Sequence, residues 1–267
     1  MMQLQNKVAE LLEKGTISLM IGFQSGINKA PVPCFIDKAS QSNQLIFNSD
    51  CKNNLAVYLH KPEVIEAKNI GIVANVPTLR SILQLLSENQ LWRIVMTIIT
   101  VNDKDEVIVF NSIEEVEAYV QEHFPEFTDE DKEQIDYINS LTREGRWEYW
   151  NDQFSACIKC YACRAVCPMC YCSQCTVEQN QPQWIKVTAE TSGNREWHTM
   201  RAMHLAGRCV NCGECGRMCP VGIPVHLLTT KMNQDISREF GAKTGFSAKG
   251  VYALNTFDPN DKEGFIK

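Results

Sequence analysis

Hydrophobic positions in the first half of the chain alternate between helical and extended spacing. Helical spacing predicts helices over residues 8–12, 53–59 and 78–88. Short runs rich in apolar and β-branched residues predict strands over residues 17–22, 44–47, 70–74 and 94–101. Strands separated by helices indicate a small α/β domain with a largely parallel sheet, which we expect over residues 1–125.

An acidic segment follows this domain. Residues 114–136 contain ten acidic residues against one basic residue, Lys132. Apolar positions at 113, 116 and 120 predict one amphipathic helix, and Thr128 followed by Asp131 predicts the cap of a second helix running toward Trp147. We therefore expect an acidic helical connector over residues 126–150. A charge run of this kind is typical of a solvated helix face; the alternative is a docking surface for a basic partner.

The whole chain sets limits on the possible classes of function. Its 267 residues are enough for two modest domains, and its net charge of −6 gives no basic field that would favour nucleic acid. The longest apolar stretch, residues 91–101, contains Arg93 and has about half of the ~20 residues that a membrane span needs. The N-terminus has no basic segment followed by an apolar core, so we expect a cytoplasmic location and no membrane span.

Cysteine is unusually abundant and unusually concentrated. Eleven of the 13 cysteines lie between Cys157 and Cys219, which leaves Cys34 and Cys51 elsewhere. A disulfide scaffold is typical of short secreted chains, and this chain has neither property. Metal ligation is therefore the favoured interpretation.

One cysteine motif occurs twice in this region. The first copy consists of Cys157, Cys160, Cys163 and Cys167 followed by Pro168. The second consists of Cys209, Cys212, Cys215 and Cys219 followed by Pro220. Both copies have the spacing C-x2-C-x2-C-x3-C-P, which is that of bacterial ferredoxins with two [4Fe–4S] clusters.

The spacing has a physical basis. Three thiolates separated by two residues each can surround one face of an iron–sulfur cube, while the fourth cysteine points away and serves the other cluster. Proline directly after it suits a helix start, where backbone N–H groups have no intrahelical partner. We therefore predict two [4Fe–4S] clusters with crossed ligand sets. The first set is Cys157, Cys160, Cys163 and Cys219, and the second is Cys209, Cys212, Cys215 and Cys167.

The main alternative to iron–sulfur clusters is zinc, which also binds paired C-x2-C motifs. Four ligands complete a zinc site, so a third cysteine at strict spacing and a following C-P would be superfluous. The local charge also favours clusters. Residues 157–226 contain seven basic and four acidic residues. This excess of positive charge would compensate the negative charge of buried clusters.

Three further cysteines follow the first copy closely. Cys172 and Cys175 have C-x2-C spacing, and with Cys170 and a distant ligand such as Cys51 or Cys34 they form a candidate third metal site. The alternatives are buried thiols that pack beside a cluster and a redox-active dithiol at Cys172 and Cys175.

The second half as a whole is predicted to be an α+β ferredoxin-like domain over residues 151–240. His198 and His204 lie on a predicted helix between the two motif copies, and another helix begins after Ile223. Residues 241–267 have scattered apolar positions and are expected to form an irregular C-terminal tail.

Several runs in the second half of the chain resemble those of a known family. The run from Cys157 to Cys175, the following Pro182-Gln-Trp-Ile, and the run from His204 to Cys215 resemble the dicluster beta subunits of anaerobic formate dehydrogenase and of heterodisulfide-reductase-type complexes. The tail, with Phe257 and Asp261, fits the same family.

The first half is similar to the N-terminal domain of beta subunits of deazaflavin-reducing hydrogenases and dehydrogenases. The similarity covers the run from Asn48 to Leu55, the run Gly71-Ile-Val-Ala, and the stretch from Arg80 to Gln90. One departure stands at residues 75–80. Where that family commonly has Lys-Gly-Cys-Asp-Ser-Arg, this chain has Asn-Val-Pro-Thr-Leu-Arg, so that a flavin or substrate contact made by that turn is expected to be lost.

The resemblance implies an electron-transfer subunit that works inside an anaerobic redox complex. The implied partners are other subunits of such a complex: a flavoprotein, a molybdenum or tungsten subunit, or a hydrogenase catalytic subunit. FAD is an implied cofactor of the N-terminal domain. Two other functions remain open at this point: a flavin-containing catalytic subunit that reduces a hydride carrier, and a zinc-stabilised interaction module. No catalytic residues are predicted.

Overall fold

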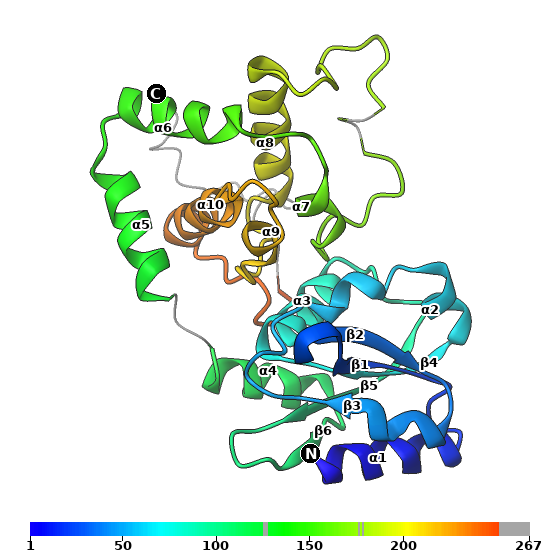
Figure 1. The fold of residues 1–267 in the computed structure, drawn as a ribbon. Coiled ribbons are helices and arrows are strands. Elements are labelled where there is room, and N and C mark those ends of the chain that lie inside the picture. Colours follow the sequence, from blue (N-terminus) through cyan, green and yellow to red (C-terminus); the bar gives the residue numbers. More distant parts are fainter. Residues whose placement is uncertain (125–127, 176, 178, 251–267) are drawn as a thin grey trace. The chain divides into compact units, whose positions relative to one another are not determined.

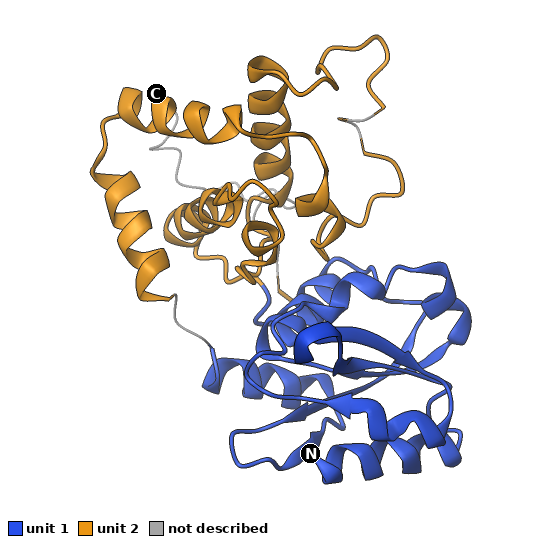
Figure 2. Ribbon diagram, viewed as in Figure 1, with its two compact units in different colours: residues 1–124, 245–249 blue, residues 125–244, 250–267 orange. Residues whose placement is uncertain are grey.

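The computed structural model describes residues 1–124, 128–175, 177 and 179–250, and it divides into two compact units (Figures 1 and 2). The sheet unit comprises Met1–Phe124 and Gly245–Lys249. The cysteine unit comprises Pro125–Thr244 and Gly250–Lys267. The tail residues Phe257 and Asp261 lie outside the described residues.

The sheet unit contains a six-stranded mixed sheet. Its strands are β1 (Leu19–Ser25), β2 (Pro31–Ile36), β3 (Leu45–Ile46), β4 (Asn69–Val73), β5 (Val95–Val101) and β6 (Val107–Val109). Its α-helices are α1 (Met2–Glu13), α2 (Pro62–Ala67), α3 (Val76–Ser87) and α4 (Ile113–Glu122). Short 3-10 helices occur at η1 (Ile27–Lys29), η2 (Ala39–Gln44) and η3 (Leu55–Tyr58).

The prediction of a largely parallel sheet is wrong except at the centre. The strand order is β2-β1-β4-β5-β6, with β3 also paired to β1. The pairs β1–β4 and β4–β5 are parallel, whereas the pairs of β1 with β2 and β3, and of β5 with β6, are antiparallel. The reason is connection length: β2 and β6 follow β1 and β5 through short turns, and a short turn reverses the chain.

The hydrophobic core of the sheet unit includes one face of the sheet and α1. Leu4, Val8 and Leu11 recur at helical spacing, and all three are buried in one cluster with residues of the sheet. The cluster members from the strands are Met20, Cys34, Ile36, Leu45, Val73 and Ile99. Figure 1 shows α1 on one side of the sheet and α3 on the other.

The turn before α3 is held by Asn75, the first residue of the segment that departs from the resembled family. Its side-chain oxygen accepts from Thr78 N at 3.0 Å, and its amide nitrogen donates to the carbonyl oxygens of Cys51 at 2.8 Å and Asn53 at 3.1 Å. Asn75 is thus the N-cap of α3, and Pro77 occupies the first turn, where a missing N–H costs nothing. These contacts give Asn75 and Pro77 a structural role at the start of α3.

We expect Asn75→Ala to lower the free energy of unfolding of the full chain by about 2–3 kcal/mol, the sum of a lost cap and two lost hydrogen bonds. Denaturant unfolding followed by circular dichroism measures this difference. The matched control is Asn43→Ala, because Asn43 is exposed on a 3-10 helix. Equal stabilities of the two variants would contradict the structural role of Asn75.

The C-terminal segment 245–249 returns to the sheet unit. Gly245 N donates to Gln84 Oε1 at 3.1 Å, and Ser247 Oγ donates to Glu117 Oε1 at 2.9 Å. The guanidinium of Arg80 stacks over the rings of Phe124 and Phe246 at 4.6 and 4.9 Å. The arginine kept from the family pattern is therefore packed into this unit.

The described residues of the cysteine unit form helices and loops. The helices are α5 (Asp129–Ser140), α6 (Arg143–Ser155), α7 (Ala162–Ala165), α8 (Thr191–Leu205), α9 (Glu214–Arg217) and α10 (Val225–Phe240). The predicted α+β character is therefore wrong for the described part of this unit, which contains no strand. The reason is local: left-handed residues interrupt both cysteine loops, and the long helix α8 occupies part of the stretch between them.

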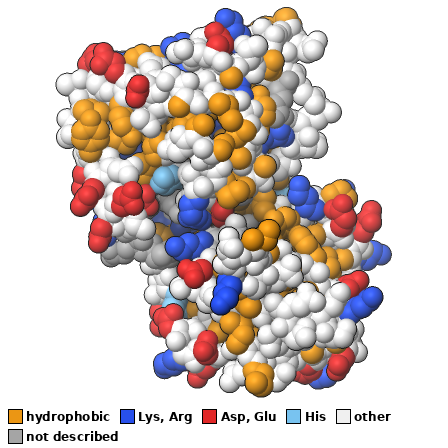
Figure 3. All heavy atoms as spheres, in the orientation of Figure 1, with side chains coloured by type: hydrophobic (Ala, Val, Ile, Leu, Met, Phe, Trp, Pro, Cys, Tyr) orange, Lys and Arg blue, Asp and Glu red, His pale blue; other side chains and the backbone are white. Residues whose placement is uncertain are grey.

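The acidic connector also differs from its prediction. The helix expected to run from Thr128 toward Trp147 is two helices, because Leu141 is extended and Thr142 begins a new helix by accepting from Gly145 N at 3.0 Å. The acidic side chains on α5 are largely exposed, and Figure 3 shows acidic residues gathered over this helix. No helix in the part of the chain that the structure describes has the length and apolar character needed to cross a membrane.

Candidate iron–sulfur site

The two cysteine loops have the same backbone conformation. The second and fourth residues after the first cysteine are left-handed in both copies: Lys159 and Tyr161 in the first, Asn211 and Gly213 in the second. A helix of one turn follows in each copy, α7 in the first and α9 in the second, and it carries the third cysteine. The sequence repeat is therefore also a structural repeat.

Backbone N–H groups in both loops point at sulfur. Lys159 N donates to Cys157 Sγ at 3.4 Å, and Asn211 N donates to Cys209 Sγ at the same distance. Ile223 N donates to Cys219 Sγ at 3.3 Å. Such N–H···S hydrogen bonds favour the thiolate over the thiol, and the thiolate is the form that binds metal.

The eight motif cysteines line two separate cavities. The first cavity is lined by Cys157, Cys160, Cys163 and Cys219. The second is lined by Cys167, Cys209, Cys212 and Cys215. Each cavity thus combines three cysteines of one motif copy with the last cysteine of the other copy, which are the two crossed sets expected from the spacing.

The cavity walls are mainly apolar. Trp197, Val221, Ile223 and Val225 line the first cavity, and Met169, Leu205 and Val210 are among the residues that line the second. Trp197 is 2% exposed and makes an edge contact with Tyr161 at a centroid distance of 4.8 Å. These side chains keep water away from the sulfur atoms.

Polar atoms without a hydrogen-bond partner lie at both cavities. His198 lines the first cavity, and neither of its ring nitrogens has a partner. Arg201 and His226 line the second, where Arg201 Nε and Nη1 and His226 Nδ1 are unpartnered. Buried polar groups are nearly always hydrogen-bonded, so these atoms mark places where a hydrogen-bond partner belongs.

Burial and neighbouring charges shift the pKa values of several of these groups. Burial raises the pKa of the Cys163, Cys209 and Cys215 thiols. A hydrogen bond with Cys170 lowers the pKa of Cys167 to about 6. Burial, assisted by Arg201 and Lys159, lowers the pKa of His198 to about 4, so that its ring is neutral at physiological pH. The buried thiols therefore need a strong electrophile such as iron to lose their protons.

These features fit two iron–sulfur clusters. Four cysteines line each cavity, N–H groups donate to three of the sulfur atoms, and residues with unpartnered polar atoms line both cavities. A [4Fe–4S] cluster with four thiolates carries negative charge, which the guanidinium of Arg201 would compensate. Its sulfur atoms accept hydrogen bonds from the N–H groups of the two loops.

The cysteines of the candidate third site have separate surroundings. Cys170 hydrogen-bonds to Cys167, Cys172 is exposed, Cys175 packs against the core around Trp197, and Cys51 is buried in the sheet unit. Among the described residues, no three His, Cys, Asp or Glu side chains are placed to hold a single metal ion. The third site stays a prediction.

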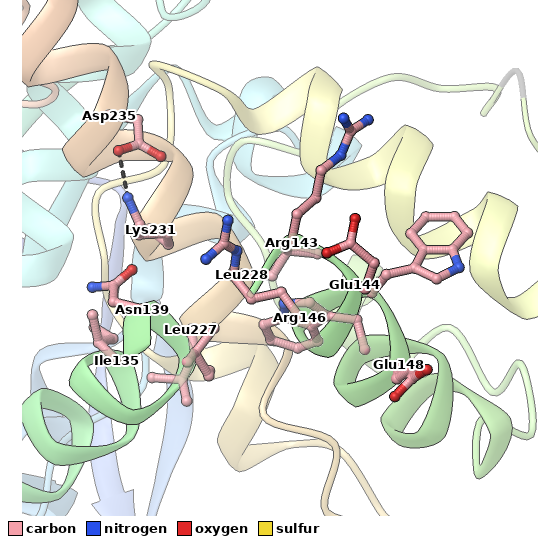
Figure 4. Close-up of a pocket in the computed structure, with 13 residues that line it drawn as sticks. Ile135, Asn139, Arg143, Glu144, Arg146, Glu148, Leu227, Leu228, Lys231 and Asp235 are labelled. Atoms are coloured by element: carbon pink, nitrogen blue, oxygen red, sulfur yellow. Dashed lines mark hydrogen bonds and ion pairs between the residues drawn. The ribbon is translucent and has the colours of Figure 1, made fainter. Parts of the chain in front are cut away.

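A cavity of about 880 Å³ lies between α5, α6 and α10 of the cysteine unit (Figure 4). Ile135, Leu227 and Trp150 contribute to its apolar wall, and Lys231 is paired with Asp235 at its edge. The ring of Trp150 stacks on Phe154 at 5.4 Å, and Phe154 stacks on His198 at 4.4 Å. This aromatic stack joins the large cavity to the first cysteine cavity.

Sequence reasoning placed His198 on a predicted helix and counted Arg201 only as one of seven basic residues, and it assigned neither residue to a cluster site. The available signal was spacing: Asn194, Trp197, Arg201 and Leu205 recur every three or four residues and form the buried face of α8. A charged residue on an otherwise buried face is unusual, and it indicates a compensating charge nearby.

A family model described as a 4Fe–4S dicluster domain matches residues 152–223. The chain therefore contains a ferredoxin-type iron–sulfur domain. The matched range includes all eight motif cysteines.

Two curated relatives define the similarity further. The F420-dependent formate dehydrogenase subunit beta of Methanocaldococcus jannaschii is 33% identical over 95 residues, which cover 35% of this chain and 24% of the relative. The F420-dependent formate dehydrogenase 1 subunit beta of Methanococcus maripaludis is 35% identical over 107 residues, which cover 40% of this chain and 27% of the relative. The resemblance to formate dehydrogenase beta subunits is confirmed, and the matched part spans about a quarter of each relative.

Proposed function

We propose that the chain is an electron-transfer subunit that carries two [4Fe–4S] clusters and works in a redox complex of the formate dehydrogenase type. The observation that carries this proposal is the division of the eight motif cysteines between two cavities, four in each. The names of the two relatives, both beta subunits of formate dehydrogenases, support the type of complex.

The chain's own residues have clear tasks in this function. The cysteines provide thiolate ligands, and the N–H groups of Lys159, Asn211 and Ile223 stabilise the sulfur charge. Trp197 and the other apolar wall residues exclude water. A [4Fe–4S] cluster supplies one-electron transfer at each site without acid–base chemistry.

The stack of Trp150, Phe154 and His198 suggests where electrons enter or leave. It begins at the cavity between α5, α6 and α10 and ends at the wall of the first cysteine cavity. We propose that a redox centre of another subunit approaches this side of the cysteine unit.

The direct test is the metal content of the full chain purified without oxygen. We expect about eight iron and about eight acid-labile sulfide atoms per chain, as two [4Fe–4S] clusters require. Reduction with dithionite should produce EPR signals of paramagnetic clusters. Zinc in place of iron, or fewer than about four irons after reconstitution, would overturn the proposal.

The partner is tested separately, by anaerobic affinity purification from the native host. We expect a formate dehydrogenase or related oxidoreductase subunit to be retained at a fixed ratio. Isolation of the chain with eight irons but with no other redox protein would contradict the complex and leave the cluster assignment intact.

A further inference from the structure

Arg201 has an unusual position for an arginine. It lies on α8 and is 4% exposed, although arginine is rarely fully buried unless it is paired. Its Nη2 donates to the carbonyl oxygen of Cys163, in the first loop, at 2.9 Å. The same side chain lines the second cavity, beside Cys167, Cys209 and Cys215. One guanidinium therefore contacts both cluster sites.

In the part of the chain that the structure describes, the charge of Arg201 is not paired with a carboxylate. Among the described residues, Arg201 forms no ion pair with Asp or Glu, and its Nε and Nη1 have no hydrogen-bond partner. The groups that interact with its charge are cysteines: Cys215, Cys167, Cys170 and Cys163. The anion that Arg201 requires is thus at the cluster sites themselves.

We propose that Arg201 is a positioning residue whose single positive charge is shared by both clusters and raises the reduction potentials of both. The inference rests on the proposed function, because it needs two clusters in the two cavities. Reduction adds one negative charge to a cluster, and a fixed cation nearby stabilises the reduced form more than the oxidised form. Since burial removes water and weakens screening, the effect of this cation is larger than that of a surface arginine.

Two other basic residues of the unit, Lys159 and Arg195, are placed differently from Arg201. Lys159 is also buried, but its Nζ donates to the carbonyl of Lys186 and it adjoins Cys157 of the first site. Arg195 lies on the same helix as Arg201, is half-buried, and stacks on Trp147 at 5.3 Å, away from the residues that line either cavity. Arg195 therefore provides a matched control with the same charge on the same helix.

The test is a potentiometric titration of anaerobically reconstituted full-length chain, followed by EPR. The variants are Arg201→Gln, Arg201→Lys and the control Arg195→Gln. Arg201→Gln is expected to shift the midpoint potentials of both clusters to more negative values. Arg201→Lys keeps the charge and should stay near the unaltered chain, and Arg195→Gln should leave both potentials unchanged.

Each other outcome has a definite meaning. Potentials in Arg201→Gln that move no more than in Arg195→Gln, or movement of one cluster alone, would overturn the shared charge. If Arg201→Gln binds no cluster, the proposal requires that Arg201→Lys bind both at the original potentials; loss of clusters in both variants would overturn it. Failure of the unaltered chain to bind about eight irons would instead reject the proposed function.

Discussion

The double variant Cys160→Ala/Cys219→Ala is expected to retain about four irons per chain and one unaltered EPR signal. The two residues belong to different motif copies, 59 positions apart in the sequence, yet both line the first cavity. Removing both takes two ligands from one site and leaves the second site with all four of its cysteines.

The matched comparison is Cys212→Ala/Cys219→Ala. These residues lie in the same motif copy, but they line different cavities. Each site then loses one ligand, and neither EPR signal should survive unaltered. Iron analysis and EPR of the two variants therefore separate crossed from uncrossed ligation: if each motif held its own cluster, the two results would be exchanged.

Cys172→Ala is the control for loss of a thiol in the same region. Cys172 is exposed and lines neither of the two cavities. Its removal should leave about eight irons and both signals. A loss of iron in this variant would instead support a third metal centre at Cys170, Cys172 and Cys175.

The ligand role of the motif cysteines could be predicted from the sequence because most ligands of one cluster lie close together in the chain. Three ligands within seven residues must surround the same object, whatever the rest of the fold does. The fourth cysteine, Cys167 or Cys219, serves the other cluster site for an equally local reason: it comes after the one-turn helix that carries the third cysteine. These features need no knowledge of long-range packing.

The sheet was harder to predict, because strand direction depends on partners far apart in the sequence. β2 was not predicted; it contains Pro31 and Pro33, and proline is disfavoured in central strands. The structure accommodates both residues because β2 is at the end of the strand order, where a missing N–H breaks no ladder on the outer side. Because β2 and β6 were not predicted, the whole sheet was expected to have the parallel arrangement that only its central strands have.

The role of Arg201 was also beyond sequence reasoning. Arg201 was counted as one of the seven basic residues of this region, but its burial depends on how α8 packs against both cysteine loops. The three-dimensional arrangement shows that Arg201 donates to the carbonyl oxygen of Cys163, a residue of the first site, and also lines the second cavity. Composition indicated the sign of the local charge, whereas the structure identifies the residue.

Gly216→Ala is expected to lower the free energy of unfolding by about 1–3 kcal/mol, the usual cost of overpacking. Gly216 lies on α9 between the second-site ligand Cys215 and Arg217. A Cβ at this position would lie 2.7 Å from Cε1 of His226 and closer still to its Nδ1. The imidazole is held on the other side by Asp131, whose Oδ1 is 3.0 Å from Nε2, so it cannot move away without breaking that hydrogen bond.

The damage should concentrate at the second cluster, because His226 and Cys215 line the second cavity. On exposure to an iron chelator, Gly216→Ala should lose about half of its iron faster than the unaltered chain, while the first EPR signal decays at its original rate. The matched control is Gly145→Ala on α6, where the nearest atom would be 3.4 Å from the new Cβ. That variant should be as stable as the original chain or slightly more so, since alanine favours the helix.

A double-mutant cycle tests whether the steric contact with His226 is the cause. His226→Ala alone should destabilise the chain, because it removes the hydrogen bond to Asp131. It also makes room for a methyl group at position 216, so the double variant Gly216→Ala/His226→Ala should be destabilised by less than the sum of the two single changes. Additive effects would show that the cost at Gly216 arises from the backbone of α9 and not from the packing of α9 against α10.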